Sequence, residues 1–374
     1  MMRPLHLSGP AAIASLLFLL SICGCSSFNP EPNVPQEEDW IVLPTDFEGG
    51  YFFLPMEMDG NPDHILWFLY DTGASYTVVD PDSLQAASDW DSSQGRKVRF
   101  GHLQCGDAKF SKVSAKVMSL SHLQAAVGRE FDGILAYSVF ADVLLNLDYP
   151  NGRMRIAEGY LPRVDDETVF KIYGDNRPYV DLSFSHTTRR ILIDSGSGLG
   201  FEVNPSKKFE WAVDPLVVGS SMGIDGLQLN YAGRLNGNAT IFNRSYRNPV
   251  LRLSDDTQLV GTDILRDYAM TFDQRAQRLE LIPSAELRLD PIAFRGTGAI
   301  FKPEDGGMVV LRLMPGSPAE KSGMLVGDHV ERAVYLNRMS RLEEESASSR
   351  TFFVRRGGKR FQLEVPVVAL IPVK

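Results

Sequence analysis

The sequence predicts a mainly β fold built from two similar halves, followed by a smaller C-terminal α+β module. Short apolar runs separated by Gly, Pro, Asn and Asp occur along most of the chain, which is typical of strands joined by turns. Two of these runs end in nearly the same tripeptide, and the composition changes after Pro283. No segment shows the alternation of strands and helices that a doubly wound α/β fold requires.

The two tripeptides are Asp-Thr-Gly at 71–73 and Asp-Ser-Gly at 194–196. Each follows an apolar run, so each aspartate is expected where a buried strand ends in a tight turn. The aspartates are 123 residues apart (194 − 71), and an apolar Gly-Ile-Leu block that begins at Gly133 has a counterpart, Gly-Thr-Asp-Ile-Leu, that begins at Gly261. Aligning these two glycines makes the similarity collinear, which predicts the duplication of a whole subdomain.

The paired turns and their downstream blocks resemble the aspartic peptidases of the retropepsin and pepsin type, over residues 49–283. The resemblance implies a bilobal double β-barrel in one chain, with short lobes at 49–160 and 161–285. It also implies that Asp71 and Asp194 form one catalytic dyad within a single chain. A monomer that hydrolyses bonds in a peptide or protein substrate is therefore expected.

The chemistry of such a dyad explains the residue types around it. Two carboxyl groups a few ångström apart share one proton, so one acts as base on a water molecule and the other as acid on the carbonyl oxygen. The pair titrates as a unit, and neither aspartate is given a separate role. Thr72 and Ser195 have hydroxyls that can hydrogen-bond between the loops, and Gly73 and Gly196 allow backbone arrangements that a Cβ would obstruct. No metal is expected, because the six histidines are far apart and lack metal-ligand spacing, and the resemblance implies a dyad that works without a cofactor.

The flap is the part of the resemblance in which this sequence departs from the family. In pepsin-like enzymes a hairpin over the cleft usually carries a tyrosine, but residues 90–130 contain none. Contacts from the first flap are therefore expected from Phe100, His102 or Leu103. A second flap-like hairpin is expected in the other lobe, around residues 224–230.

A competing motif overlaps this second hairpin. Gly-Ser-Ser-Met-Gly, from Gly219, matches G-x-S-x-G and would place Ser221 on the nucleophile elbow of a serine hydrolase. An elbow requires a helix after the serine, but the residues that follow have an early glycine, Gly226, and no helical period. The hairpin is therefore the favoured interpretation.

Residues 286–374 are predicted to form the third module. The segment from Gly306 to Val330 resembles the core of a bacterial PDZ domain, with Ser317 as the cap of a short helix. PDZ domains bind extended peptides at a sheet edge and hold a terminal carboxylate. The resemblance places the carboxylate loop at Thr297, Gly298 and Ala299, so a C-terminal peptide is a candidate partner. A module that only braces the second lobe is the alternative.

The N-terminal segment indicates where the chain works. Residues 1–24 have the apolar core of a signal peptide, and Ile-Cys-Gly-Cys at 22–25 resembles the lipobox of bacterial lipoproteins. Cys25 would carry the lipid, residues 25–48 would form an extended tether, and Ser26 is typical of lipoproteins sent to the outer membrane. We therefore expect a membrane-anchored protein of the bacterial envelope that faces the periplasm, with plain secretion as the alternative.

The remaining composition is consistent with this location. A net charge of −9 argues against nucleic acid as a partner. Once Cys25 is acylated, Cys105 is the one cysteine left in the mature chain, so no intrachain disulfide is expected. The alternative function is a catalytically inactive lipoprotein that binds envelope peptides. Short helices are predicted at residues 83–88, 139–144, 264–268, 318–322 and 341–347.

Overall fold

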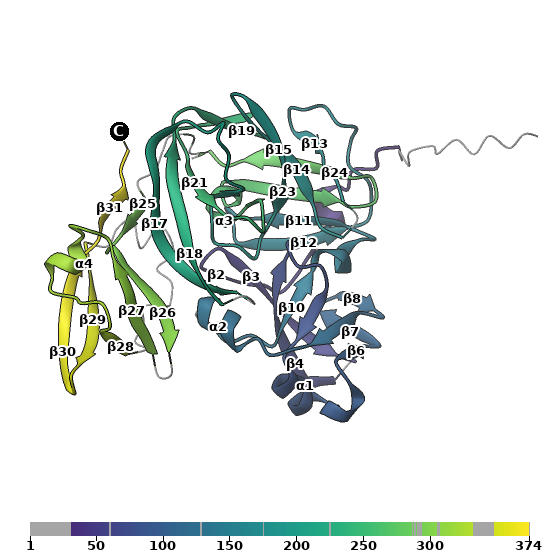
Figure 1. Ribbon diagram of the computed structural model, residues 1–374. Helices are drawn as coiled ribbons and strands as arrows, with labels where there is room; N and C mark the ends of the chain where they lie inside the picture. The colour runs from purple at the N-terminus through teal and green to yellow at the C-terminus, as the bar shows by residue number, and fades with distance from the viewer. Residues whose placement is uncertain are drawn as a thin grey trace, which may run out of the picture.

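The structure is a computed structural model that describes residues 31–373, except 60, 128, 175, 224–225, 286, 288, 290–293, 305–306 and 332–347. The predicted mainly β fold is confirmed (Figure 1). The signal peptide, Cys25 and the predicted helix at 341–347 lie outside the described residues. Within the described part of the chain, no helix is long and apolar enough to cross a membrane.

The helices are few and short, as the sequence predicts. The α-helices are α1 (Pro81–Ala87), α2 (Ser121–Val127), α3 (Thr262–Leu265) and α4 (Pro318–Lys321), and the 3₁₀ helices are η1 (Glu37–Asp39), η2 (Ser92–Gln94) and η3 (Tyr137–Phe140). Helices α1, η3, α3 and α4 lie within a few residues of predicted positions, whereas α2 was not predicted. Ser317 caps α4 as expected, since its hydroxyl accepts a hydrogen bond from the backbone N–H of Glu320.

Residues 49–160, the first repeat, contribute most of a nine-stranded sheet. Its order is β6 (Lys97–Arg99), β9 (Ser114–Val117), β5 (Thr77–Val79), β10 (Gly133–Ala136), β4 (Asn61–Asp71), β3 (Tyr51–Met58), β7 (His102–Cys105) and β8 (Ala108–Ser111), with β2 (Asp46–Glu48) paired to β3. At its centre β4 runs parallel to β10, β10 antiparallel to β5, and β5 parallel to β9. This local order surrounds the first aspartate.

Residues 161–285, the second repeat, contain a second nine-stranded sheet. Its order is β17 (Trp211–Gly223), β18 (Gly226–Leu235), β21 (Val250–Leu253), β16 (Phe201–Val203), β22 (Leu259–Val260), β15 (Thr187–Ile193), β14 (Tyr179–Phe184), β19 (Asn238–Ile241) and β20 (Arg244–Arg247). Here β15 is parallel to β22, β22 antiparallel to β16, and β16 parallel to β21. The central topology of the first repeat is thus present a second time.

A six-stranded sheet joins the two repeats. Its order is β1 (Ile41–Val42), β12 (Arg153–Ala157), β11 (Leu144–Asp148), β23 (Tyr268–Asp273), β24 (Arg278–Pro283) and β13 (Val169–Lys171). Strands β11 and β23, one from each repeat, are hydrogen-bonded neighbours at its centre. Every residue of β11 is buried, and a continuous apolar core extends from Leu43 to Leu281 across both repeats. The hydrophobic effect therefore stabilises the two repeats as one packed unit.

The register of the duplication differs from the sequence alignment. Ala136 is paired with Asp71, and the equivalent pairing in the second repeat, of Ile193 with Val260, places Gly261 beside Asp194. Gly261 is thus the counterpart of Ala136, and aligning it with Gly133 is wrong by three residues. The corrected separation, 125 residues (261 − 136), also relates η3 to α3 and β11 to β23.

Two further expectations about the first repeat are wrong. Phe100, between β6 and β7, and Leu103 of β7 are 2% and 0% exposed and belong to the core, so they cannot make flap contacts. His102 is half-buried, with Nδ1 3.8 Å from Oδ1 of Asp59.

The predicted extended tether, residues 25–48, ends earlier than expected. Strand β1 pairs with β12, β2 pairs with β3, and Leu43 is buried, so much of residues 33–48 packs against the first repeat.

The hairpin formed by β17 and β18 is the longest in the described chain (Figure 1). Its base is tied to the sheet, because residues 231–234 of β18 pair with β21. Its distal half, residues 219–223 and 226–230, pairs only within the hairpin among the described residues. A register irregularity between Val217 and Gly219 lies where the two parts meet. The hairpin therefore has a fixed base and a distal half that projects beyond its sheet.

The C-terminal module has its own sheet and its own core. The five-stranded sheet runs β26 (Ala299–Glu304), β27 (Gly307–Leu313), β28 (His329–Glu331), β29 (Ser349–Arg356) and β30 (Lys359–Pro366), and β25 (Phe294–Gly296) pairs separately with β31 (Val368–Ile371). Figure 1 shows the module beside the long hairpin. Arg234 of β18, 1% exposed, donates to the backbone carbonyls of Ile371 and Pro372. Charged hydrogen bonds of this kind are strong, so they hold the module to the base of the hairpin.

Candidate active site

Each aspartate stands at the end of a buried strand, as its apolar run predicts. Asp71 is the last residue of β4, and Asp194 follows Ile193, the last residue of β15. Each carboxyl group closes its own turn: Oδ1 of Asp71 accepts from the N–H of Gly73 at 2.7 Å, and Oδ1 of Asp194 accepts from the N–H of Gly196 at 2.9 Å. These bonds fix the direction of each carboxyl group before any ligand is present.

Reciprocal hydrogen bonds join the two turns. The backbone N–H of Thr72 donates to Oγ of Ser195 at 2.9 Å, and the N–H of Ser195 donates to Oγ1 of Thr72 at the same distance. Each hydroxyl also donates to a carbonyl in the opposite repeat: that of Thr72 to Ile193 and that of Ser195 to Tyr70. All four bonds are buried, where polar groups must be paired, so the two turns form one rigid unit.

Each glycine lies against the aspartate of the other repeat. A Cβ added to Gly73 would be 2.6 Å from Oδ2 of Asp194, and one added to Gly196 would be 2.6 Å from Oδ1 of Asp71. Neither glycine has a positive φ. Glycine is therefore required here by the close approach of the opposite carboxyl group, and a left-handed backbone plays no part.

The two carboxyl groups lie together, each against the glycine of the opposite turn, and each affects the pKa of the other. Burial raises the pKa of Asp71, and the hydrogen bonds from Gly73 and Asp194 oppose this rise. Burial raises the pKa of Asp194 well above its ordinary value, and the charge of Asp71 raises it further. Because both pKa values are raised and ionising one group disfavours ionising the other, the pair retains one proton to higher pH than isolated carboxyl groups would.

Two tyrosines outside the motifs lie next to this pair. The phenol oxygen of Tyr51, at the start of β3, would be 2.8 Å from a Cβ on Gly198, so it lies against the second turn. Tyr149 is 3% exposed, and burial raises its pKa well above the ordinary value, with further contributions from the charges of Asp194, Tyr51 and Asp71. Sequence reasoning missed both residues, because they are distant in sequence from the tripeptides.

The serine-hydrolase alternative is not supported by the local structure. Ser221 lies within strand β17, which continues to Gly223 and returns as β18 from Gly226. A nucleophile elbow places its serine at a sharp turn between a strand and a helix, and no helix follows here. The favoured interpretation, a hairpin in the second repeat, is the one that the structure contains.

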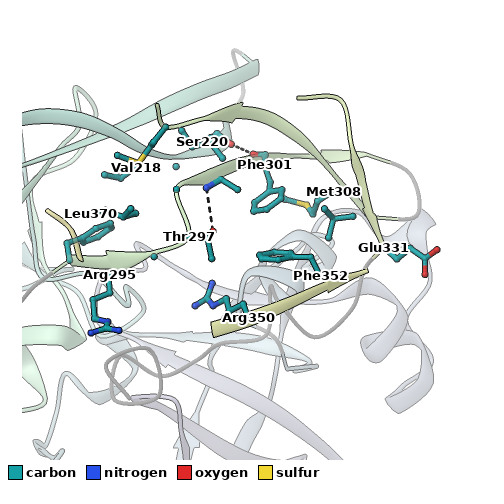
Figure 2. Close-up of a pocket in the computed structure, with 18 residues that line it drawn as sticks. Val218, Ser220, Arg295, Thr297, Phe301, Met308, Glu331, Arg350, Phe352 and Leu370 are labelled. Carbon is teal, nitrogen blue, oxygen red and sulfur yellow. Dashed lines mark hydrogen bonds between the residues drawn. The ribbon is translucent and has the colours of Figure 1, made fainter. Parts of the chain in front are cut away.

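The residues proposed for peptide binding in the C-terminal module lie far along the chain from the aspartates. Thr297 is buried, and Gly298 has a φ of +81°, which strongly favours glycine. With Ala299 they line a cavity of about 300 Å³ that also contacts β17 (Figure 2). The hydroxyl of Ser220 in β17 donates to the backbone carbonyl of Phe301 in β26, as Figure 2 shows. Among the described residues, no three His, Cys, Asp or Glu side chains gather as metal ligands do.

The comparisons with known proteins give little. No protein-family model matches the chain, and no curated protein matches it. Among solved structures, the chain is similar to a retropepsin-like aspartic protease from Rickettsia conorii, with 14% sequence identity and a TM-score of 0.25. This similarity covers 32% of the present chain and 91% of the Rickettsia chain.

Proposed function

We propose that this chain is an aspartic endopeptidase in which Asp71 and Asp194 form the catalytic dyad. The observation that carries the proposal is the reciprocal construction of the site: two aspartate turns from two repeats, joined by buried hydrogen bonds, with the carboxyl group of each turn against the glycine of the other. Ordinary turns of the form Asp-Thr-Gly or Asp-Ser-Gly have no need for such pairing, since one turn is complete in itself.

The dyad would hydrolyse a peptide bond in two proton-transfer steps. The shared proton can start on either aspartate; when it starts on Asp194, the Asp71 carboxylate takes a proton from a water molecule while the water oxygen attacks the carbonyl carbon. Asp194 gives its proton to the carbonyl oxygen, which forms a tetrahedral diol. The diol then collapses: its C–N bond breaks, the nitrogen takes a proton from Asp71, and a diol hydroxyl returns its proton to Asp194.

The β17–β18 hairpin is proposed as the flap that covers a bound substrate. Its support is the distal half, which projects beyond the sheet and is free of pairing with other strands in the described chain. Hairpins of this kind close over a substrate and exclude water from the reaction. The first repeat would contribute little to this closure, since β6 has only three residues.

Two parts of the proposal concern location and recognition. The lipobox supports lipid attachment at Cys25 and anchoring in the bacterial envelope, on the periplasmic face of the outer membrane. Residues 286–374 are proposed as a PDZ-like domain for peptide recognition or regulation. Labelled palmitate incorporated by the wild-type protein and not by Cys25→Ser would support the anchor, whereas equal labelling of the two proteins would contradict it.

Cleavage of a peptide library tests the activity. We expect the purified protein to cut peptides at some pH between about 3 and 8, because a singly protonated dyad exists only between its two apparent pKa values. Asp71→Asn and Asp194→Asn should fold, with unchanged circular dichroism, and leave the library intact. A folded wild-type protein that cuts nothing across this range would contradict the peptidase and favour the peptide-binding alternative.

A further inference from the structure

Tyr149 is a buried tyrosine whose hydroxyl makes no hydrogen bond among the described residues. It follows Asp148, the last residue of β11, and is 3% exposed. Its ring packs edge-on against Phe52 of β3, with the ring centroids 4.9 Å apart, and against Phe47 of β2, at 6.0 Å. Buried polar groups are normally paired, so this hydroxyl needs an explanation other than a structural hydrogen bond.

The strand register brings the ring of Tyr149 beside the first aspartate. Positions 53 of β3 and 69 of β4 are opposite each other, so the antiparallel register, continued by one residue, places Phe52 opposite Tyr70. Opposite residues of such a pair lie on the same face, and Phe52, Tyr70 and Tyr149 all belong to the core shared by the two repeats. Tyr70 immediately precedes Asp71. The ring that packs against Phe52 therefore lies next to the end of the strand that carries Asp71.

The titratable groups that face the hydroxyl of Tyr149 are all acids: Asp194, Asp71, Tyr51 and Tyr70. Burial is the largest cause of the raised pKa of Tyr149, and the charge of Asp194 is the next. Tyrosine hydroxyls are neutral below about pH 10, so the negative charge at this place comes from the aspartates. A hydroxyl can rotate about its C–O bond, and a site of low dielectric strengthens the attraction between its O–H dipole and a nearby negative charge.

The equivalent position in the second repeat has no hydroxyl. The corrected separation of 125 residues relates Tyr149 to Gln274 (149 + 125 = 274). Nε2 of Gln274 donates to the backbone carbonyl of Tyr137 in η3 at 2.7 Å. The aspartate turns are therefore symmetric, whereas the hydroxyl of Tyr149 approaches them from one repeat alone. Duplication accounts for the two aspartates and does not account for Tyr149.

We propose that Tyr149 is a positioning residue of the dyad, whose hydroxyl dipole stabilises the single negative charge that Asp71 and Asp194 share. The hydroxyl acts through the carboxyl groups and touches neither the substrate nor the attacking water. Stabilising the charged form lets the pair lose its first proton at lower pH, which extends the singly charged dyad toward acid. The electrostatic link is a property of the folded chain, and its effect on cleavage rests on the proposed function.

Titration of the carboxyl carbons tests the link without a substrate. Aspartate is labelled with ¹³C in the full-length protein, and the dyad signals are assigned by their loss in Asp71→Asn and Asp194→Asn. Tyr149→Phe deletes one oxygen atom and keeps the ring. We expect the first ionisation of the dyad to move to higher pH by roughly 0.5 units or more, the effect of about one hydrogen bond.

Tyr137→Phe is the matched control. Tyr137 is 1% exposed, and its hydroxyl also lacks a hydrogen bond among the described residues. Burial raises the pKa of Tyr137, and the charge that raises it further is that of Asp273, which lies outside the dyad. Removing this hydroxyl should leave the titration of the dyad unchanged. An unchanged titration in Tyr149→Phe, or an equal shift in both variants, would overturn the inference.

Stability and cleavage complete the test. At the acid end of the titration, where the pair is uncharged, Tyr149→Phe should melt no lower than the wild-type protein, and a lower Tm would overturn the inference by showing a structural hydrogen bond. The acid limb of kcat/KM should move to higher pH with the titration. Wild-type cleavage with neither shift in Tyr149→Phe would overturn the inference and leave the peptidase intact. A shifted titration in a protein that cleaves nothing would refute the peptidase and retain the link.

Discussion

The two repeats are alike where they hold the aspartates and differ in the hairpin that follows. Both place an aspartate at the end of a strand that is parallel to a downstream partner. In the first repeat the topological counterpart of β18 is β6, which has three residues, whereas β18 has ten and forms a hairpin with the thirteen residues of β17. The aspartate turns, which hydrogen-bond to each other, are therefore alike in both repeats. The β17–β18 hairpin, which contacts the C-terminal module, has this length in the second repeat alone among the described residues.

The aspartate turns and the long hairpin are also held in place by different contacts. The aspartate turns support each other through reciprocal bonds, so a change in either turn affects both. The long hairpin is supported from one side by its sheet and from the other by the C-terminal module, through Arg234 and Ser220. Substitutions in either aspartate turn should therefore have similar effects on activity and stability. Substitutions at the base of the hairpin should change hydrogen exchange in the second repeat and leave the first repeat unchanged.

The largest effect is expected from alanine at either glycine of the turns. Gly73→Ala and Gly196→Ala each put a Cβ 2.6 Å from an oxygen of the opposite aspartate, so each must displace a carboxyl group. A displacement approaching 1 Å reduces the rate by about 100-fold, and we expect a similar loss of kcat on both sides. Gly200→Ala is the control, because its Cβ has 3.9 Å of clearance. A loss on one side only would contradict the reciprocal site.

Removing the buried arginine should affect the second repeat alone. Arg234→Met leaves the carbonyls of Asn248, Ile371 and Pro372 without this donor, which we expect to lower the free energy of unfolding by about 3 kcal/mol. Hydrogen exchange should rise in β18 and β31 while β4 stays protected. Arg99→Met, on the exposed part of β6, is the matched control. Equal exchange in both repeats would show that the module supports more than the hairpin.

The hydroxyls that join the turns should show matched, smaller effects. Thr72→Val and Ser195→Ala each leave a buried N–H of the opposite turn without its acceptor. We expect each to lower the free energy of unfolding by about 1–2 kcal/mol in chemical denaturation. The double variant should lose less than the sum, since the two residues share one network. Strict additivity would indicate that the turns are independent.

The smallest effect concerns the pH dependence of stability. Both carboxyl groups have a raised pKa in the folded protein, so their contribution is full below the unfolded pKa near 4 and is lost as pH rises through the folded pKa. Asp194→Asn removes that loss, so the Tm of this variant at pH 8 should exceed the wild-type Tm, by about 1 °C for each kcal/mol gained by a chain of 374 residues. The gain for Asp71→Asn should be smaller. A variant less stable than wild type at pH 8 would contradict a raised pKa.

Patterns of neighbouring residues in the sequence predicted the strand ends that carry the two aspartates and the contacts of the tripeptides. The apolar runs before Asp71 and Asp194 place both residues at strand ends, and the tripeptides indicate the hydroxyl and glycine contacts. The register of the duplication could not be obtained this way, because the Gly-Ile-Leu similarity favours Gly133 although Ala136 occupies the equivalent position. Tertiary pairing settles such a shift, since sequence similarity over three residues carries little information.

Residues that act through distant contacts escaped prediction. A single arginine in a strand, such as Arg234, is usually solvent-exposed, and only folding brings the last carbonyls of the chain to it. Tyr51 and Tyr149 reach the aspartate turns from strands or strand ends outside the motifs. Leu103 of β7 and Phe100, before β7, were expected to make flap contacts but belong to the core, because the side that a strand residue faces depends on a register that the sequence does not show.

The most direct test of the central claim is the turnover of Asp71→Asn, Asp194→Asn and the double variant on one substrate cut by the wild-type protein. The two aspartates act as a unit in this account, so each single variant should lose as much kcat as the double variant, at least about 1,000-fold. Folding is checked by thermal denaturation of all three variants. Substantial turnover in either single variant, or losses that multiply in the double variant, would contradict a shared dyad.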